Sequence, residues 1–235
     1  NEFYNSGYNL NYEIINANDF GVSQKRERLI LVGYRKDLIC NQTFIDCLNK
    51  YIEKAPTLKE LFEDLPKIKA GNSSDKYYCD SSSIFVDKYI RDKKDILTQH
   101  IARPHNKNDL KIYQLVLKAK KRGKNLRYVD IPKKFQTHSN TTSFLDRYKA
   151  LDYKSPSHTI VAHISKDGHY YIHPDLKQNR SITVREAARI QGFPDNFYFE
   201  HSRTAAFKQI GNAVPPILSK KIALAIIDFL SNANN

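Results

Sequence analysis

The sequence predicts a mixed α/β fold, on three observations. A β-prone stretch over 12–35 contains the apolar run Leu-Ile-Leu-Val at 29–32, which is typical of a strand buried on both faces of a mostly parallel sheet. Apolar residues at helical spacing follow Thr57 and Thr183, each with a Glu three positions later, which is the pattern of a capping box. The pair Pro-Pro at 215–216 begins a last apolar helix, because proline fits a first helical turn.

The expected strands surround two turns. Residues 12–35 predict two strands joined at the Asn-Asp-Phe-Gly segment 18–21, because such residues favour turns. A second strand pair is expected over 159–164 and 170–172, around the Lys-Asp-Gly turn at 166–168.

The expected helices have clear boundaries. One short helix is expected over 57–65 and a basic helix over 108–122, with Asn108 as its N-cap and Gly123 at its end. The helix that follows the second capping box ends at Gly192.

Charge is the strongest compositional feature. The formal net charge is +13, which indicates a polyanionic partner, usually nucleic acid. Residues 101–150 hold 13 Lys and Arg against 3 Asp, so this segment alone carries a net charge of +10. A solvated basic surface would have the same composition, so charge alone leaves both interpretations open.

Other classes of protein are disfavoured. No apolar run approaches the roughly 18–20 residues that a membrane span needs, and no signal-peptide pattern is present. Cys40, Cys47 and Cys79 have neither paired spacing nor nearby His residues, so we expect reduced cytosolic thiols, no disulfide and no metal site. Asn1 is not expected to be the native start, because the chain contains no Met.

The first informative string is Gln-Lys-Arg-Glu-Arg at 24–28. On a strand, alternate residues share a face, so Gln24, Arg26 and Arg28 would point together. Two guanidinium groups and an amide would offer donors to phosphate oxygens and to a base carbonyl. A charged strand edge that discourages aggregation would have the same pattern.

The second string covers 180–195. Its helix places Arg185 and Arg189 one turn apart, and Glu186 is expected to be occupied by capping. Gly192 and Pro194 then force a sharp exit. This pattern favours a structural organiser over a catalytic site.

The third string is Gln-Ile-Gly-Asn-Ala-Val-Pro-Pro at 209–216. It predicts a turn of small residues before a helix N-terminus, where a backbone approaches a ligand closely and free amides favour an anion. An ordinary helix entry is the alternative.

In this order and spacing, the three strings resemble motifs VIII, IX and X of the DNA (cytosine-5) methyltransferase family. The resemblance extends from about residue 12 to about residue 230. The variable stretch between the first two strings corresponds to the family's target-recognition region. Ser-Pro-Ser-His-Thr-Ile at 155–160 resembles the close of that region, and His-Pro at 173–174 is typical of many bacterial members.

The resemblance implies two structural parts. Residues 1–35 and 205–235 would belong to an incomplete doubly wound, Rossmann-like methyltransferase domain. Residues 36–204 would form a smaller, irregular α+β target-recognition domain that faces the major groove of duplex DNA, where base pairs are distinguishable.

The resemblance also implies residue roles. Family members flip a cytosine out of the duplex, add a cysteine thiolate to carbon 6 and transfer a methyl group from S-adenosylmethionine to carbon 5. Arg28 would contact the cytosine carbonyl oxygen and Arg26 an adjacent phosphate, with Gln24 beside them. The cofactor pocket would include Asn212, Ala213 and Val214. The residues that brace the recognition domain would be Arg185, Glu186, Arg189, Gly192 and Pro194. The residues that bind DNA would be Arg103, Lys118, Lys120, Lys121, Arg122, Lys124, Arg127 and Thr159.

Three of the family's strings are absent from this chain. None of its cysteines lies in the Pro-Cys-Gln string of the nucleophile, and neither the Glu-Asn-Val string nor the Phe-x-Gly-x-Gly cofactor loop occurs. We therefore expect an incomplete cofactor site and no methyl transfer by this chain alone. A second chain, or a missing N-terminal half, would supply the strings, in a naturally split enzyme or in one cut short.

The leading hypothesis is a subunit or fragment of a DNA methyltransferase from a bacterial restriction-modification system, working in the cytoplasm at the nucleoid. The alternative is a sequence-specific DNA-binding module that has lost catalysis. A generic basic scaffold or RNA-binding protein would explain the charge but not the motifs. If the leading hypothesis holds, residues 12–35 and 209–230 should expose an apolar patch or bury it in a dimer.

Overall fold

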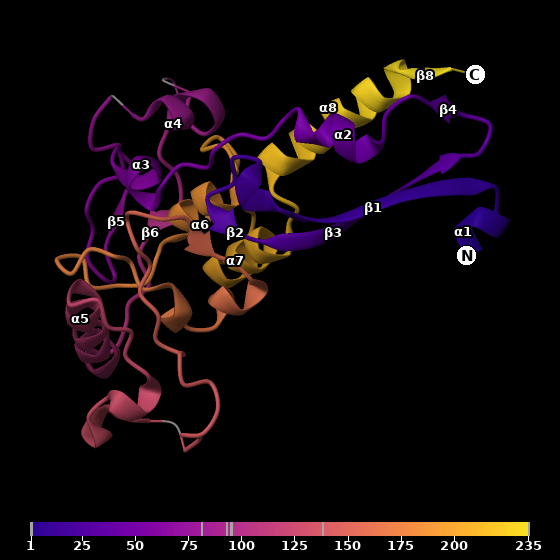
Figure 1. Ribbon diagram of the computed structural model, residues 1–235. Coiled ribbons are helices and arrows are strands. Elements are labelled where there is room, and N and C mark those ends of the chain that lie inside the picture. The colour runs from indigo at the N-terminus through magenta and orange to yellow at the C-terminus, as the bar shows by residue number, and fades with distance from the viewer. Residues whose placement is uncertain (1, 81, 93, 95, 138, 235) are drawn as a thin grey trace.

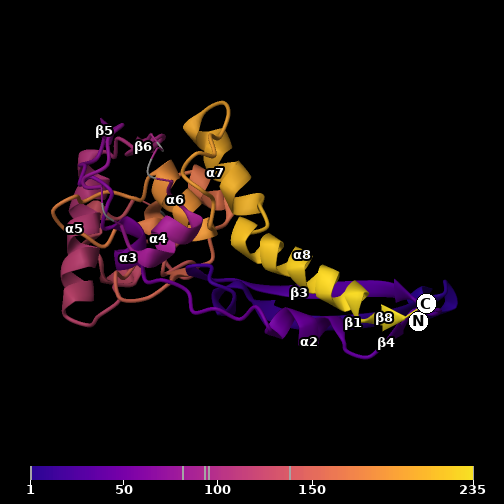
Figure 2. The same cartoon turned by 90° about the horizontal axis from the view of Figure 1, so that it is seen from above.

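A long antiparallel hairpin and a C-terminal helix form an arm that projects from the rest of the molecule (Figures 1 and 2). The computed structural model describes residues 2–80, 82–92, 94, 96–137 and 139–234. Both ends of the described chain lie at the tip of the arm (Figure 2). The arm comprises α1 (Glu2–Asn5), β1 (Tyr8–Asn16), β3 (Glu27–Arg35), β4 (Ile39–Cys40), α2 (Phe44–Asn49), α8 (Pro216–Ser231) and β8 (Ala233–Asn234).

The hairpin strands differ from the expected buried strand. β1 and β3 pair antiparallel along their whole length. Ile30, Val32 and Tyr34 turn inward onto the core, and the Tyr34 ring lies 5.2 Å from that of Phe229 on α8. The Leu29 side chain is 59% exposed, because no other element of the described chain covers the outer face. The expectation of a strand buried on both faces is therefore wrong for this chain as described.

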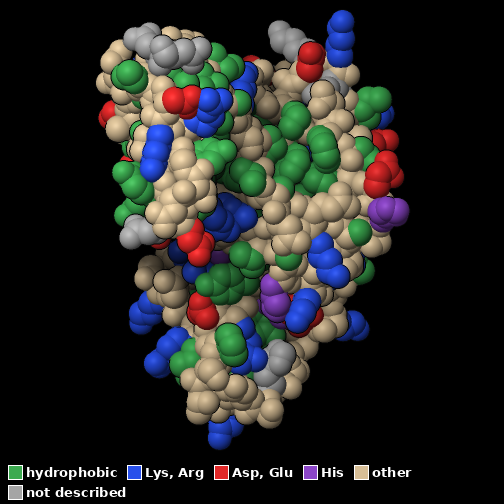
Figure 3. Space-filling model, turned by 90° about the vertical axis from the view of Figure 1, so that its right-hand side faces the viewer, with side chains coloured by type: hydrophobic (Ala, Val, Ile, Leu, Met, Phe, Trp, Pro, Cys, Tyr) green, Lys and Arg blue, Asp and Glu red, His purple; other side chains and the backbone are tan. Residues whose placement is uncertain are grey.

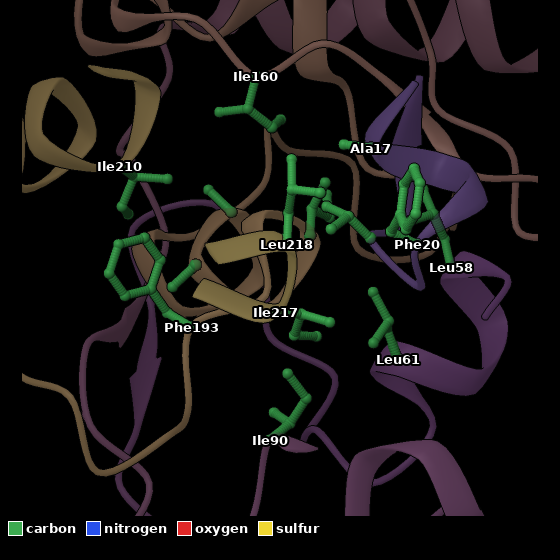
Figure 4. Packing of buried hydrophobic residues seen from close by; sticks show 14 of the residues in the cluster. Ala17, Phe20, Leu58, Leu61, Ile90, Ile160, Phe193, Ile210, Ile217 and Leu218 are labelled. Carbon is green, nitrogen blue, oxygen red and sulfur yellow. The ribbon is translucent and has the colours of Figure 1, made fainter. Parts of the chain in front are cut away.

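The main core joins segments that are distant in the sequence. Figure 4 shows Phe20 near Leu58, with Ile160, Ile217 and Leu218 around the same centre. This core contains residues from both predicted parts of the chain. Around it lie η1 (Ala17–Asp19), β2 (Gln24–Lys25), α3 (Leu58–Phe62), α4 (Ile84–Tyr89), α6 (Val184–Gln191) and α7 (Arg203–Asn212).

A second, smaller core lies under the basic helix α5 (Lys107–Lys121). Ile112, Tyr113 and Leu117 pack there against Tyr128 and Tyr148. Figures 1 and 2 place α5 at the end of the molecule opposite the tip of the arm. The short elements β5 (Ser73–Ser74), β6 (His100–Ile101), η2 (Tyr128–Asp130) and η3 (Lys133–Phe135) complete this side.

Local capping chemistry predicted several helices correctly. Both capping boxes form, one at Thr57 before α3 and one at Thr183 before α6. Pro216 is the first residue of α8, as expected. The N-cap of α5 is Asn106 rather than Asn108, and its side chain accepts a hydrogen bond from the Asp109 amide at 2.8 Å.

The predicted strand pair at 159–172 is wrong. The chain forms only β7 (Ser157–His158), parallel to β2, and then η4 (Ala162–Ser165) and η5 (His169–Tyr171). Gly168 occupies the expected turn, with φ of +77°. A side chain replaces the strand ladder, because the Tyr171 hydroxyl donates to the Thr159 carbonyl at 2.8 Å and accepts from the Val161 amide at 3.2 Å.

The third string is the end of a helix, not a turn. Residues 209–212 complete α7, and only 213–215 link it to α8. The close backbone approach expected there exists, but its partner is another segment of the same chain. A Cβ atom on Gly211 would lie 2.3 Å from the Ala162 amide nitrogen. Glycine therefore allows α7 to contact η4.

We expect Gly211→Ala to lower the free energy of unfolding by about 1–3 kcal/mol or more, because backbone cannot move aside as a flexible side chain can. Urea unfolding of the purified chain measures this loss. Gly33→Ala is the matched control, because the nearest atom to its new Cβ would be 3.8 Å away. Equal stability of the two variants would contradict this account of the contact.

Candidate functional site

The Arg26 guanidinium joins two of the three strings to the segment after Thr159. It is buried, and its Nη1 donates to the Ile160 carbonyl at 2.8 Å. Its Nη2 lies 3.3 Å from the carbonyl oxygens of both Gly211 and Ala213. Burial, and then the nearby charge of Arg28, lower the pKa of Arg26. One side chain therefore fixes positions that are up to 187 residues apart in the sequence.

Gln24 brings the second string to the same place. Its side chain is buried, and its Oε1 accepts a hydrogen bond from the Ile160 amide at 2.9 Å. Its Nε2 donates to the side chain of Gln191, and the Gln191 Nε2 donates to the Ala213 carbonyl at 2.8 Å. All three strings thus meet through side-chain amide and guanidinium groups.

The three donors of the first string do not share one outward face. The backbone leaves the strand at Arg26, between β2 and β3, and this break interrupts the alternation of side chains. Gln24 and Arg26 turn inward, where backbone carbonyls and a glutamine engage them. Arg28 is exposed, and its Nη1 donates to the neighbouring Glu27 carbonyl at 2.6 Å. Of the three, only Arg28 lies on the surface.

The predicted cofactor residues lie at the junction of α7 and α8. Asn212 and Val214 are exposed, whereas the Ala213 carbonyl accepts two hydrogen bonds, one from Arg26 and one from Gln191. Thr159 is half-buried, and its hydroxyl donates to the Lys25 carbonyl at 2.5 Å. Phosphate oxygens accept hydrogen bonds but do not donate them, so the Thr159 hydroxyl would have to release the Lys25 carbonyl before it could donate to a phosphate.

The first bracing residue, Arg189, lies between two buried carboxylates. Its Nη1 is 2.5 Å from Asp64 and its Nη2 is 2.5 Å from Asp195, and all three side chains are fully buried. Burial opposes ionisation of Arg189, but the charge of Asp195 and the hydrogen bonds to both carboxylates overcome this effect and raise its pKa. Arg91 adds a second cation 3.2 Å from Asp64.

The other bracing residues hold the two ends of α6. At the start of the helix, Glu186 accepts two hydrogen bonds of 2.7 Å from Arg180. Arg185 donates from Nη1 to the Pro194 carbonyl at 3.1 Å. At the end of the helix, Gly192 has φ of +84°, and a Cβ atom there would lie 3.1 Å from Ile217. The 180–195 string predicted a structural role for these residues, but no sequence pattern predicted the role of Asp64.

The predicted DNA-binding cations divide into two groups. Arg103 is engaged within the protein, because it donates to the carbonyls of Ile164, Ser165 and Lys166 at 2.8–3.2 Å. These contacts favour a structural role for Arg103. The remaining cations lie at the end of α5 and in the loop after it. Lys118, Lys121, Arg122 and Lys124 are exposed, Lys120 lies 3.9 Å from Asp152, and Arg127 pairs with Asp130 at 3.2 Å.

Comparison with known proteins identifies the class of protein that contains this site. A family model described as C-5 cytosine-specific DNA methylase matches residues 1–228, so the chain belongs to that family. It is 41% identical over 225 residues to the type II methyltransferase M.Bpa9945I of Bacillus paralicheniformis, covering 93% of this chain and 51% of that protein. It is 30% identical over 249 residues to the type II methyltransferase M.DdeI of Desulfomicrobium norvegicum, covering 99% and 58%.

Solved structures agree on the fold. A prophage-encoded protein of E. coli described as a DNA modification methyltransferase superposes with a TM-score of 0.65 and 25% identity, over 97% of this chain and 62% of that one. The methyltransferase fold with mixed α/β structure is therefore confirmed. The chain spans only about half to three-fifths of the length of the relatives M.Bpa9945I and M.DdeI. No described helix is long and apolar enough to cross a membrane.

We expect Arg189→Met to lower the free energy of unfolding by about 3–5 kcal/mol, because Asp64 and Asp195 would lose their shared cation while buried. Chemical unfolding measures the loss. Arg127→Met is the control, because the Arg127–Asp130 pair is on the surface, and we expect no measurable change. A small effect of Arg189→Met would contradict the bracing role.

We also expect stability to fall in mild acid through His105. Burial, and then the charge of Arg103, lower the pKa of His105 to about 3. The unfolded chain therefore binds a proton below about pH 6.5 that the folded chain does not, and stability is lost as pH falls from that value toward 3. At pH 5, His105 should lower the free energy of unfolding by about 1–2 kcal/mol relative to pH 7.5.

Unfolding measured at both pH values tests this expectation. His105→Asn should reduce the difference between them by about 1–2 kcal/mol. The part due to His158 and His173 should remain, because burial lowers their pKa values as well. His201→Asn should leave the difference unchanged, because the His201 side chain is exposed. An unchanged pH dependence in His105→Asn would show that His105 does not cause the acid sensitivity.

Proposed function

We propose that this chain is the C-terminal, target-recognition part of a DNA cytosine-5 methyltransferase. It would bind duplex DNA and help to transfer a methyl group to carbon 5 of a flipped cytosine. The convergence of the three strings around Arg26 and Gln24 is the observation that supports this most strongly, because it builds one site from the segments that family members share. Gln24 and Arg26 would hold the site's backbone, and Arg28 would act at its surface.

Arg28 suits a contact with the cytosine carbonyl oxygen. Its exposed guanidinium carries several donors, and a charge-assisted hydrogen bond to a carbonyl is stronger than a neutral one. S-adenosylmethionine would supply the methyl group. The side chains of Asn212 and Val214 are exposed at the junction between α7 and α8, so they fit one edge of a cofactor site.

The outer face of the hairpin supports a missing companion part. Tyr12 is paired with Leu31 and Ile14 with Leu29, and all four side chains are more than two-fifths exposed. They form an apolar strip on the side of β1 and β3 that faces away from α8. Figure 3, viewed from the end of the arm, shows several groups of hydrophobic side chains on the surface. Apolar strips of this kind are usually covered by partner surface.

The nucleophile would come from that companion part. Burial raises the pKa of the Cys47 thiol, which disfavours the reactive thiolate. Neither Cys40 nor Cys79 lies in a Pro-Cys-Gln string. The companion part, as a second chain or as the N-terminal half of one protein, would add the catalytic Cys, the Glu and the glycine-rich loop. We propose that this chain alone does not methylate DNA.

The second candidate function is a DNA-binding module without catalysis. The exposed cations Lys118, Lys121, Arg122 and Lys124 support it as well as the first, because phosphate contacts need only positive charge. Only the presence of a companion part separates the two candidates.

We expect no turnover when the chain is incubated alone with duplex DNA and labelled S-adenosylmethionine, and turnover when a polypeptide with the Pro-Cys-Gln and Glu-Asn-Val strings is added or joined. Arg28→Ala in the complete enzyme should lower the rate about 100-fold or more, because a donor to the developing charge is lost. Arg35→Ala, an exposed arginine of the same strand, should leave the rate unchanged.

Turnover by the chain alone would overturn the proposed need for a companion part. If no mixture shows turnover but DNA binding is retained, the DNA-binding module without catalysis is favoured. Equal rates for the two arginine variants would remove Arg28 from the site.

A further inference from the structure

An aromatic pocket lies beside the candidate site, between the segment at 144–147 and the 3₁₀ helices η4 and η5. Its volume is about 430 Å³, and Phe144, Val161, His163, Tyr170 and Tyr171 line much of it. Its lining is mostly apolar, which suits a flat aromatic ligand. None of the predicted site residues lines this pocket.

Phe144 is unusual in two respects. Its side chain is 76% exposed, although phenylalanine gains most from burial. Its backbone has φ of +54°, a left-handed conformation that is strained for a bulky residue. The Arg147 side chain stabilises this turn, because it donates to the carbonyls of Asn140, Ser143 and Phe144 at 2.9–3.2 Å. The chain thus holds an aromatic ring in solvent at the edge of a pocket.

The pocket is rigidly joined to the site around Arg26. The Tyr171 hydroxyl bonds to both Thr159 and Val161. Between those residues, the Ile160 carbonyl accepts from Arg26 and the Ile160 amide donates to Gln24. The pocket therefore lies next to Thr159, one of the predicted DNA-binding residues.

The pocket includes part of the most basic segment of the sequence, and its polar groups suit a particular kind of base. Phe144 and Arg147 lie within the 101–150 segment of net charge +10, which attracts phosphate. Two carboxylates, Asp146 and Asp167, also line the pocket. Asp146 accepts from the Tyr170 hydroxyl at 2.8 Å and keeps further acceptor capacity. A carboxylate accepts a hydrogen bond from the exocyclic amino group of cytosine.

We propose that this pocket binds an unstacked nucleobase that carries an exocyclic amino group, in addition to the cytosine that is methylated. The base stacks against Phe144, and its amino group donates to Asp146. This inference rests on the proposed DNA-binding function, and it assigns Phe144 and Asp146 as residues that select the base. Sequence-tolerant stacking and a carboxylate acceptor together favour cytosine or adenine over thymine.

Single strands test the pocket without knowledge of the target sequence. Fluorescence anisotropy would measure binding of the 235-residue chain to labelled oligo-dC, oligo-dA and oligo-dT of equal length, with a mixed-sequence duplex in parallel. We expect oligo-dC and oligo-dA to bind about 5-fold or more tightly than oligo-dT. Phe144→Ala should weaken binding of oligo-dC by about 5-fold or more, as the loss of one stacking partner does.

Two further variants complete the test. Asp146→Asn should bring the ratio of oligo-dC to oligo-dT affinity toward one, a readout that a general change in charge does not imitate. Tyr78→Ala is the matched control for Phe144→Ala, because its ring is 72% exposed and lies outside this pocket, and its affinities should not change.

The outcomes separate this inference from the proposed function. Duplex binding with no preference among the oligonucleotides, or with Phe144→Ala equal to wild type, would overturn the pocket and leave the proposed function standing. Failure to bind either duplex or single strands would overturn both. Preference for amino-bearing bases that disappears in Phe144→Ala and Asp146→Asn would establish the pocket.

Discussion

The buried charges of α6 determine which other segments must pack against this helix. Every residue from Val184 to Gln191 is buried, including Arg185, Glu186 and Arg189. A charge excluded from water must be paired, or it destabilises the fold by several kcal/mol. The chain therefore has to bring Asp64, Asp195 and several backbone carbonyls to this helix. These contacts fix the loops that pack around α6. At the end of the helix, the Gln191 side chain accepts a hydrogen bond from Gln24.

The same rule shapes the candidate site. Gln24 and Arg26 are polar side chains without access to water, so they form hydrogen bonds with backbone groups of segments far along the chain. Their burial makes the base of the site rigid, and it leaves Arg28 as the donor at the surface. A rigid support of this kind keeps a functional group within the tolerance that chemistry requires. The aromatic pocket shares this support through Ile160 and Tyr171.

The two faces of the arm differ in what covers them. Its inner face packs on the core through Val32 and Tyr34, while its outer face exposes Tyr12, Ile14 and Leu31. Burial of these side chains would add stability in proportion to the apolar area removed from water. The proposed companion part would bury these side chains, and it would also carry the catalytic strings that this chain lacks. Its contact with the outer face of the arm would therefore both stabilise the arm and complete the catalytic site.

The family, the mixed α/β class and several local features could be predicted from the sequence: the capping boxes at Thr57 and Thr183, the proline start of α8 and the turn at Gly168. These depend on neighbouring residues, so a local pattern is sufficient to predict them. Three features could not be predicted in this way: Arg26 turns inward, residues 159–172 form 3₁₀ turns, and Asp64 pairs with Arg189. The positions of Arg26 and Asp64 depend on partners more than 100 residues away in the sequence, and the turns at 159–172 depend on the side-chain bonds of Tyr171. The direction of a buried polar side chain depends on which distant groups form hydrogen bonds or ion pairs with it. Local spacing in the sequence does not predict those partners.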